Sequence, residues 1–481
     1  MGKIFRWPLN HKFKAILALL LLVLVMRLVW GWSVHRELQS RLSAIRARGE
    51  PINASEVVHQ AVPDEDNAVL VYRKAISALN ERVDCPRNSN LEYPDYFPRP
   101  PKWMALAEAS EKAQSSVFPL VRSARQRQRA QFATSFSEQA ELRYLGQLRD
   151  LANVINDGAE YSHLRGNDAE AIERLLDSLH LSRALAADDY LVSYLVAIGI
   201  DASTCHSIML IASDLSAAPE NIRSLIDQLL DEKAHRDALK RTLINERVRQ
   251  IHSYVRSSRD HWVLAPLADR DLIRELPNLE LILHAADCPD FAQAQKFLQR
   301  CQWDIPPQST RFVIFPSPTM IPRYSRWFYD SVDFSPQVER CYRVLAERRL
   351  TAISLACRLY RDEHGQFPQN LQQLVPKYLP AIPTDPFFSD GRPIGYAIKT
   401  HTAPLSGRRP VLYFDPGGGD IVLKPEPLYD WYVLPIGGAS VRQYRDISRF
   451  APASAKAVNN NPNQPNAPGQ DSQEKKGFQE P

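Results

Sequence analysis

An unbroken apolar run near the N-terminus, AILALLLLVLVM at positions 15–26, constrains this chain more than any other feature. A helix needs about 20 apolar residues to cross a hydrocarbon core of ~30 Å. The run is too short alone, but its extension through Arg27 as far as Val34 is long enough. The sequence therefore predicts a transmembrane helix over residues 15–34.

Arg27 interrupts this segment, and two properties of the segment make it tolerable. A charge deep in lipid costs roughly 2.5–3.5 kcal/mol on insertion scales, whereas each Leu, Ile or Val of the run returns about 0.3–0.6 kcal/mol. The Arg27 side chain can also extend toward the headgroups, where Trp30 and Trp32 suit the interface. The alternatives to an uncleaved anchor are a cleaved signal peptide, although no Ala-x-Ala site follows, and a buried helix of a soluble protein.

The charges on either side of the run set its expected orientation. Four basic residues and no acidic residue precede it: Lys3, Arg6, Lys12 and Lys14. Four further arginines follow it and weaken the asymmetry: Arg36, Arg41, Arg46 and Arg48. Since a basic flank before a span stays in the cytoplasm, we expect residues 1–14 to be cytoplasmic and the bulk of the chain to be extracytoplasmic. The membrane partner expected is the bacterial inner membrane, crossed by a single-pass protein.

The composition limits the other partners. The chain has 481 residues, of which 44% are hydrophobic, and its formal net charge is +4. A nearly balanced charge argues against nucleic-acid binding, and the length suits about two or three domains.

The six cysteines lie at positions 85, 205, 288, 301, 341 and 357 and form no CxxC pair. Cys288 and Cys301 are the closest pair and could form a disulfide in an oxidising compartment. Cys341 and Cys357 are expected on one helix, about 24 Å apart, which is too far to bridge. Buried free thiols are the expectation for most of the six.

Residues 35–263 are expected to form a helical array. Leu38, Leu42 and Ile45 fall on one helical face, so the membrane helix should continue outward as a stalk that ends near Gly49.

Farther along the array, a turn at Gly166 and Asn167 should end one long helix and cap the next. This helix pair, followed by the apolar segment Leu191–Ile211, loosely resembles helical-repeat proteins of the tetratricopeptide type. No second copy appears at a spacing of about 34 residues, and an irregular bundle is the equal alternative. Leu191–Ile211 is apolar on most faces and should be buried between neighbours.

The remainder divides into three expected parts of a mainly α fold. Residues 264–334 are Pro-rich and should form an irregular connection. Residues 335–450 should form a small α+β module, which begins with a long helix that Ser335 opens and Gly365 ends. Residues 451–481 are polar and should be a disordered tail.

Four short motifs follow one another at the end of that long helix. They are Gly365-Gln366-Phe367-Pro368, then Leu371 and Leu374, then LPAIPTDP at 379–386, and finally Tyr396. Residues 349–398 thereby resemble the soluble part of type II secretion major pseudopilins, which implies a helix packed on a small antiparallel sheet and implies no activity. Unlike in that family, the helical array separates the module from the membrane segment, and no prepilin-peptidase motif precedes the span. The whole arrangement resembles bacterial single-span proteins that combine an anchor, a helical array and a pseudopilin-like end.

No pattern of residues points to a reaction. The chain contains no HExxH, no GxSxG and no phosphate-binding Gly-rich loop. His284 and Cys288 could share a helix face with Cys301 beyond, but zinc prefers four ligands at tighter spacings. We therefore expect no catalytic, cofactor-binding or metal-binding residue. For Asp201, within an apolar helix, a pairing with an arginine or a position facing solvent is favoured over catalysis.

Three arginines recur at helical spacing: Arg122, Arg125 and Arg129. A solvated face is the expectation, and contact with anionic lipid or an acidic partner is the alternative.

These features favour a non-enzymatic, membrane-anchored extracytoplasmic scaffold that binds other envelope proteins. A component of a type II secretion or pilus-like envelope machine is one alternative. An envelope hydrolase with a site assembled from scattered residues is the other.

Overall fold

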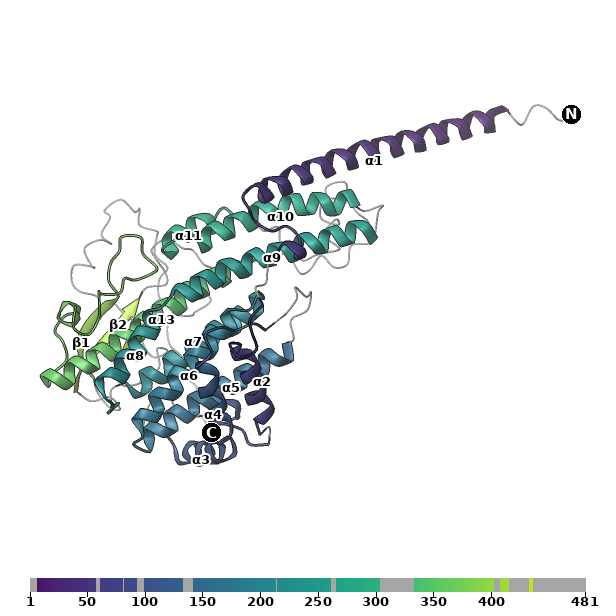
Figure 1. Ribbon diagram of the computed structural model, residues 1–481. Helices are drawn as coiled ribbons and strands as arrows, with labels where there is room; N and C mark the ends of the chain where they lie inside the picture. Colours follow the sequence, from purple (N-terminus) through teal and green to yellow (C-terminus); the bar gives the residue numbers. More distant parts are fainter. Residues whose placement is uncertain are drawn as a thin grey trace, which may run out of the picture.

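Helices make up most of the described chain, as the spacing of its apolar residues predicts (Figure 1). The structure, a computed structural model, describes residues 7–57, 61–80, 82–92, 99–132, 142–212, 214–260, 265–302, 333–401, 407–414 and 432–435. The α-helices are, in chain order, α1 (Trp7–Ala47), α2 (Ala68–Ala78), α3 (Pro101–Ala113), α4 (Val117–Arg125), α5 (Leu142–Leu164), α6 (Asp168–Ala186), α7 (Leu191–Ile211), α8 (Pro219–Leu230), α9 (Lys233–Asp260), α10 (Ala265–Ala286), α11 (Phe291–Leu298) and α13 (Ser335–His364). Among the described residues, three short 3-10 helices accompany them: η1 (Ala54–Glu56), η2 (Pro86–Asn88) and η5 (Leu371–Leu374). The fold class is mainly α, as predicted, and the tail expected at 451–481 lies outside the described residues.

Helix α1 projects from the body toward the N-terminus and is continuous over 41 residues (Figure 1). Its large apolar side chains are exposed from Phe13 to Trp32, and none of its most apolar window is buried. From Val34 onward one face is buried, and Leu38 and Ile45, each 1% exposed, pack in a core shared with α9 and α10. An apolar helix that continues as a stalk is therefore confirmed.

The exposed apolar part of α1 is shorter than the predicted span. Val34, its predicted end, is 9% exposed and belongs to the protein core. The reason is that α10 already reaches α1 at Gly31, where a Cβ atom would lie 3.1 Å from the Cγ atom of Pro266.

The helical array predicted at residues 35–263 is present in its described part, as the end of α1 followed by α2 to α9. Gly166 has φ +77°, and the Asn167 side chain accepts a hydrogen bond of 3.3 Å from the backbone N–H of Glu170, as the turn between α5 and α6 requires. Helix α7 is long and apolar enough to cross a membrane, but 67% of its apolar window is buried. It is the core helix that the sequence predicts.

The irregular connection predicted at residues 264–334 is wrong for the described part of that segment. Helices α10 and α11 occupy it, and Leu272, Leu276 and Leu279 bury one apolar face of α10. Pro277 interrupts the helical spacing of apolar residues in the sequence and so argues against a helix. In the structure it lies on the exposed side of α10. There its missing N–H costs a backbone hydrogen bond without disturbing the packing. Residues 303–332 lie outside the described part.

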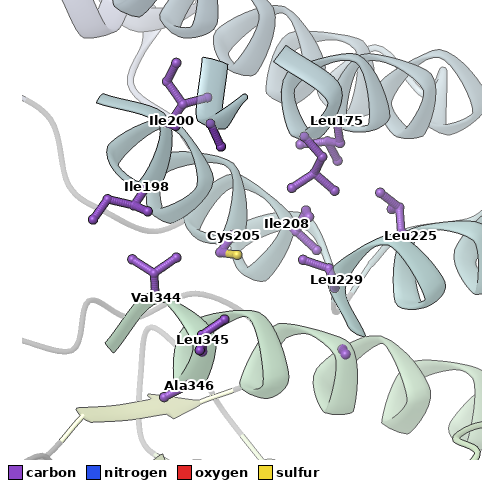
Figure 2. Close-up of a cluster of buried hydrophobic side chains, with 14 of the residues drawn as sticks. Leu175, Ile198, Ile200, Cys205, Ile208, Leu225, Leu229, Val344, Leu345 and Ala346 are labelled. Atoms are coloured by element: carbon purple, nitrogen blue, oxygen red, sulfur yellow. The ribbon is translucent and has the colours of Figure 1, made fainter. Parts of the chain in front are cut away.

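Helix α13 is buried on two sides. An apolar stripe on one side is entirely buried: Tyr342, Ala346, Leu350, Ile353, Cys357 and Tyr360. A second set of buried residues, Val344 and Leu345 among them, lies against Ile198 of α7 and Leu229 of α8 (Figure 2). One hydrophobic core therefore joins α13 to the array.

A small antiparallel sheet packs on α13. Its strands are β1 (Gly395–His401), β2 (Gly407–Phe414) and β3 (Tyr432–Pro435), in the order β1-β2-β3. Leu412 and Phe414 of β2 enter the same core as Ile353. Gly365 ends α13 at φ +68°, and the Tyr396 hydroxyl donates to the Pro368 carbonyl at 2.5 Å. The expected helix-on-sheet arrangement is confirmed at the level of fold.

Candidate functional site

A groove of about 960 Å³ lies between the end of α4, the α6–α7 turn and α9. Its charged lining residues are five arginines and three aspartates: Arg125, Arg127, Arg129, Arg183, Arg241, Asp188, Asp189 and Asp237. Apolar side chains, Leu176 and Ala184 among them, complete the lining. The groove is therefore positive on balance and partly apolar.

Two arginines of the groove are well exposed to solvent. Arg129 is one of them. The side chain of Arg183 is 49% exposed, and its Nη1 lies 3.0 Å from a carboxylate oxygen of Asp231, whose side chain is 40% exposed. An exposed pair of this kind is worth about 0–1 kcal/mol, so an incoming carboxylate can compete with it.

Arg241 has a structural task in the groove. Its Nη2 donates a 2.6 Å hydrogen bond to the carbonyl oxygen of Ala186, the last residue of α6. A cation at a helix C-terminus is favourable because the helix dipole is negative there. Arg241 therefore fixes the end of α6, while Arg129 and Arg183 lie at the solvent side of the groove.

His180 lies in the groove wall, where its hydrogen-bond partners fix its tautomer. Its Nε2 is 3.1 Å from the Arg127 carbonyl, which can only accept, so Nε2 donates. Its Nδ1 then accepts from the Tyr72 hydroxyl at 2.7 Å. Burial lowers the pKa of His180 to about 4, so the ring is neutral at pH 7 and adds no charge to the groove.

The expectation of a solvated face at Arg122, Arg125 and Arg129 is wrong for the first two. Arg122 Nε lies 2.8 Å from Asp177 Oδ2, and Arg125 Nε lies 2.9 Å from Asp177 Oδ1. Burial raises the pKa of Asp177 to about 6, and the two guanidinium groups act in the opposite direction. Arg122 and Arg125 lie on α4 and Asp177 lies on α6, so these contacts hold the two helices together. Arg129 alone of the three is exposed, at the groove.

Asp201 is paired with an arginine, as favoured from the sequence. It is fully buried on α7, with Arg348 Nη1 at 2.5 Å and His235 Nε2 at 2.8 Å from its Oδ2. Burial alone would raise its pKa, but the charge of Arg348 and the contact with His235 prevail and hold it well below the usual range. This cluster joins α7, α9 and α13 and presents no group to solvent.

A second buried ionic cluster was not predicted from the sequence. Arg87 Nη1 lies 2.6 Å from Asp157 Oδ1, and Arg87 Nη2 lies 2.7 Å from Glu160 Oε1. Arg99 Nη2 lies 2.6 Å from the other oxygen of Glu160. Burial would raise the pKa of Glu160, but the two arginines lower it to about 2. With its carboxylates held by guanidinium groups, the cluster fastens η2, through Arg87, and the residue Arg99 onto α5.

His284, Cys288 and Cys301 do not converge on one point. The Cys288 thiol donates to the His284 carbonyl at 3.3 Å, and the Cys301 thiol lies 3.9 Å from the Asn278 carbonyl. The described part of the chain contains no group of three or more His, Cys, Asp or Glu able to hold a metal ion. All six cysteines are free thiols, so Cys288 and Cys301 are not bridged in this structure.

The groove could not be found from the sequence. Its residues come from four segments that are far apart in the chain, and each arginine alone looks like an ordinary surface residue. Only the fold brings Arg129 next to the C-terminal end of α6 and to α9.

No family model, curated protein or solved structure matches this chain. Neither the pseudopilin resemblance nor the tetratricopeptide resemblance therefore gains support from a family.

Proposed function

We propose that this chain is a membrane-anchored, extracytoplasmic interaction protein of the bacterial inner membrane, and that its arginine-lined groove binds an acidic peptide segment of another envelope protein. The observation that carries the proposal is the continuity of α1: its exposed apolar half suits lipid, and its other half is packed into the body. A body held in this way stays at the membrane and presents its surfaces there.

The groove supports an acidic partner through its charges and its shape. Arg129 and Arg183 are exposed at its rim, whereas Asp188 is buried and accepts from the Ser193 hydroxyl at 2.5 Å. Burial raises the pKa of Asp188. Apolar side chains such as Leu176 can receive the non-polar parts of a peptide.

Topology is tested with reporter fusions in bacterial cells. A reporter that works only in the periplasm should be active when placed after residue 57. At residue 1, only a reporter that works in the cytoplasm should be active. The basic residues before the span are the reason for this expectation. Cytoplasmic activity after residue 57 would overturn the proposed orientation.

Peptide binding is tested by fluorescence polarisation with the full chain in detergent. Labelled decapeptides rich in Glu, in Ser or in Lys serve as probes, and only the acidic ones should bind, with an affinity that falls as salt rises. Arg129→Glu/Arg183→Glu should weaken binding at least tenfold. The control Arg165→Glu/Arg223→Glu, at two exposed positions outside the groove, should leave binding unchanged. Equal binding by both double variants would refute the proposal that the groove binds the acidic peptide.

A further inference from the structure

Helices α1 and α10 run side by side in the same direction, so α10 begins level with a defined point of α1. Gly31 faces Pro266, His35 Nδ1 lies 3.1 Å from Asp269 Oδ2, and Arg48 Nη2 lies 2.8 Å from Glu280 Oε1. In all three pairs the two residue numbers differ by nearly the same amount, so positions farther along α1 meet positions farther along α10. The first turn of α10 is therefore fixed beside Gly31.

The length of α1 places Gly31 at the edge of a bilayer. The stretch from Phe13 to Trp30, apolar except for Lys14 and Arg27, has 18 residues, which span about 27 Å at ~1.5 Å per residue. This nearly fills a hydrocarbon core of ~30 Å. Trp30 and Trp32 are tryptophans of the kind enriched at the interface, and the guanidinium carbon of Arg36 lies 5.4 Å from the Trp32 ring.

The outer side of α10 carries groups that suit this depth. Leu267 is half-buried and directly follows Pro266, and Arg270 and Arg274 lie one and two turns farther on, about 6 and 12 Å along the axis. Headgroup layers add roughly 5–8 Å on each side of the hydrocarbon core. Arg270 thus lies within the layer of lipid phosphates, and the long side chain of Arg274 can reach it. Among the described residues, neither arginine has an ion-pair partner.

From this register we infer that the start of α10 is a second membrane contact, in which Leu267 enters the interface and Arg270 and Arg274 bind the phosphates of anionic phospholipids. The inference rests on the membrane anchoring in the proposed function and is independent of the groove. The occupant is a lipid surface, because the apolar part of α1 ends at the same level. The contact gives the body two points of attachment and so fixes its rotation about α1.

The contact is tested with the full chain reconstituted in vesicles that contain headgroup-spin-labelled lipid. A fluorophore is attached at Leu267→Cys in a Cys301→Ser background, since the other five thiols are buried. A matched label at Gln366→Cys, an exposed position two residues after the end of α13, is the control. The Leu267 label should be quenched at least twice as strongly as the Gln366 label, and more strongly in phosphatidylglycerol-containing vesicles than in phosphatidylcholine vesicles.

The charges are tested in the same vesicles. Arg270→Gln/Arg274→Gln should abolish the excess quenching that phosphatidylglycerol causes, whereas Arg165→Gln/Arg223→Gln should preserve it. Equal quenching at Leu267 and Gln366, or an excess that survives Arg270→Gln/Arg274→Gln, would overturn the inference. A third label at Leu22→Cys, quenched by lipids brominated in the acyl chain, reports insertion of α1 itself. Failure of the anchor and absence of the α10 contact therefore give different results.

Discussion

Replacement of Arg348 by methionine should destabilise the body more than any exposed charge substitution. Arg348 is 3% exposed and neutralises Asp201 at 2.5 Å. Its Nε donates to the Leu229 carbonyl at 3.1 Å, and its Nη2 donates to the Gln228 carbonyl at 2.5 Å. Methionine fills similar space without these bonds, so a buried carboxylate and the carbonyls at the end of α8 lose their donor.

The expected loss follows from these contacts. Breaking a buried ion pair by removing one partner costs about 3–5 kcal/mol, and His235 stays bonded to Asp201, which keeps the loss within that range. Asp201→Asn combined with Arg348→Met removes the stranded charge, so the double variant should lose less than the sum of the single losses, with a coupling of about 0.5–3 kcal/mol. Arg343→Met on the same helix, where the arginine side chain is 31% exposed and pairs with Glu339, should cost under about 1 kcal/mol.

Urea unfolding of the detergent-solubilised full chain, followed by circular dichroism, measures these free energies. The pH dependence gives a second readout. Because Asp201 has a lowered pKa in the folded state, its contribution is present above its unfolded pKa of about 4 and is lost as pH falls through the folded value. The advantage of the native chain over Arg348→Met should therefore persist at pH 7 and shrink in strong acid. A loss below about 1 kcal/mol at pH 7, well under the range for a broken buried pair, would refute the reasoning.

Two further predictions concern single residues. Gly365→Val should cost about 1 kcal/mol or more, because Gly365 has φ +68° and no atom lies within 4 Å of the position that a Cβ would take, so backbone strain alone acts; Gly365→Asn should cost less in the same urea assay, and equal losses would contradict this reason. A His180 pKa lowered to about 4 makes the native chain lose stability as pH falls from about 6.5 to 4. His180→Gln should therefore make the free energy of unfolding depend less on pH in that window. An unchanged pH dependence would show that His180 is not held neutral.

The fold was predictable where one apolar periodicity decides the structure. The stripe on α13 and the Gly166–Asn167 turn are such cases, since each depends on residues close together in the chain. The second buried side of α13 was missed because Val344 and Leu345 lie between Arg343 and Arg348, and Arg348 is itself among the buried residues. A buried arginine looks like a surface residue until its carboxylate partner on another helix is known.

The ionic clusters and the groove depend on distant pairs and could not be predicted. Arg87 is far in sequence from Asp157, and Arg129 is far from Arg241. Neither separation leaves a local pattern. The helices α10 and α11 were missed for a different reason, because Pro266 and Pro277 suggest an irregular segment although both are tolerated at a helix start or on an outer face.

With α1 inserted in a bilayer, as proposed above, the absence of any break in it between Trp7 and Ala47 makes bilayer thickness a mechanical variable for this protein. A helix whose apolar length differs from the local hydrocarbon thickness responds by tilting. With α1 rigidly joined to α9 and α10, any such tilt turns the whole body through the same angle. The direction in which the groove faces would then differ between thin and thick regions of one membrane.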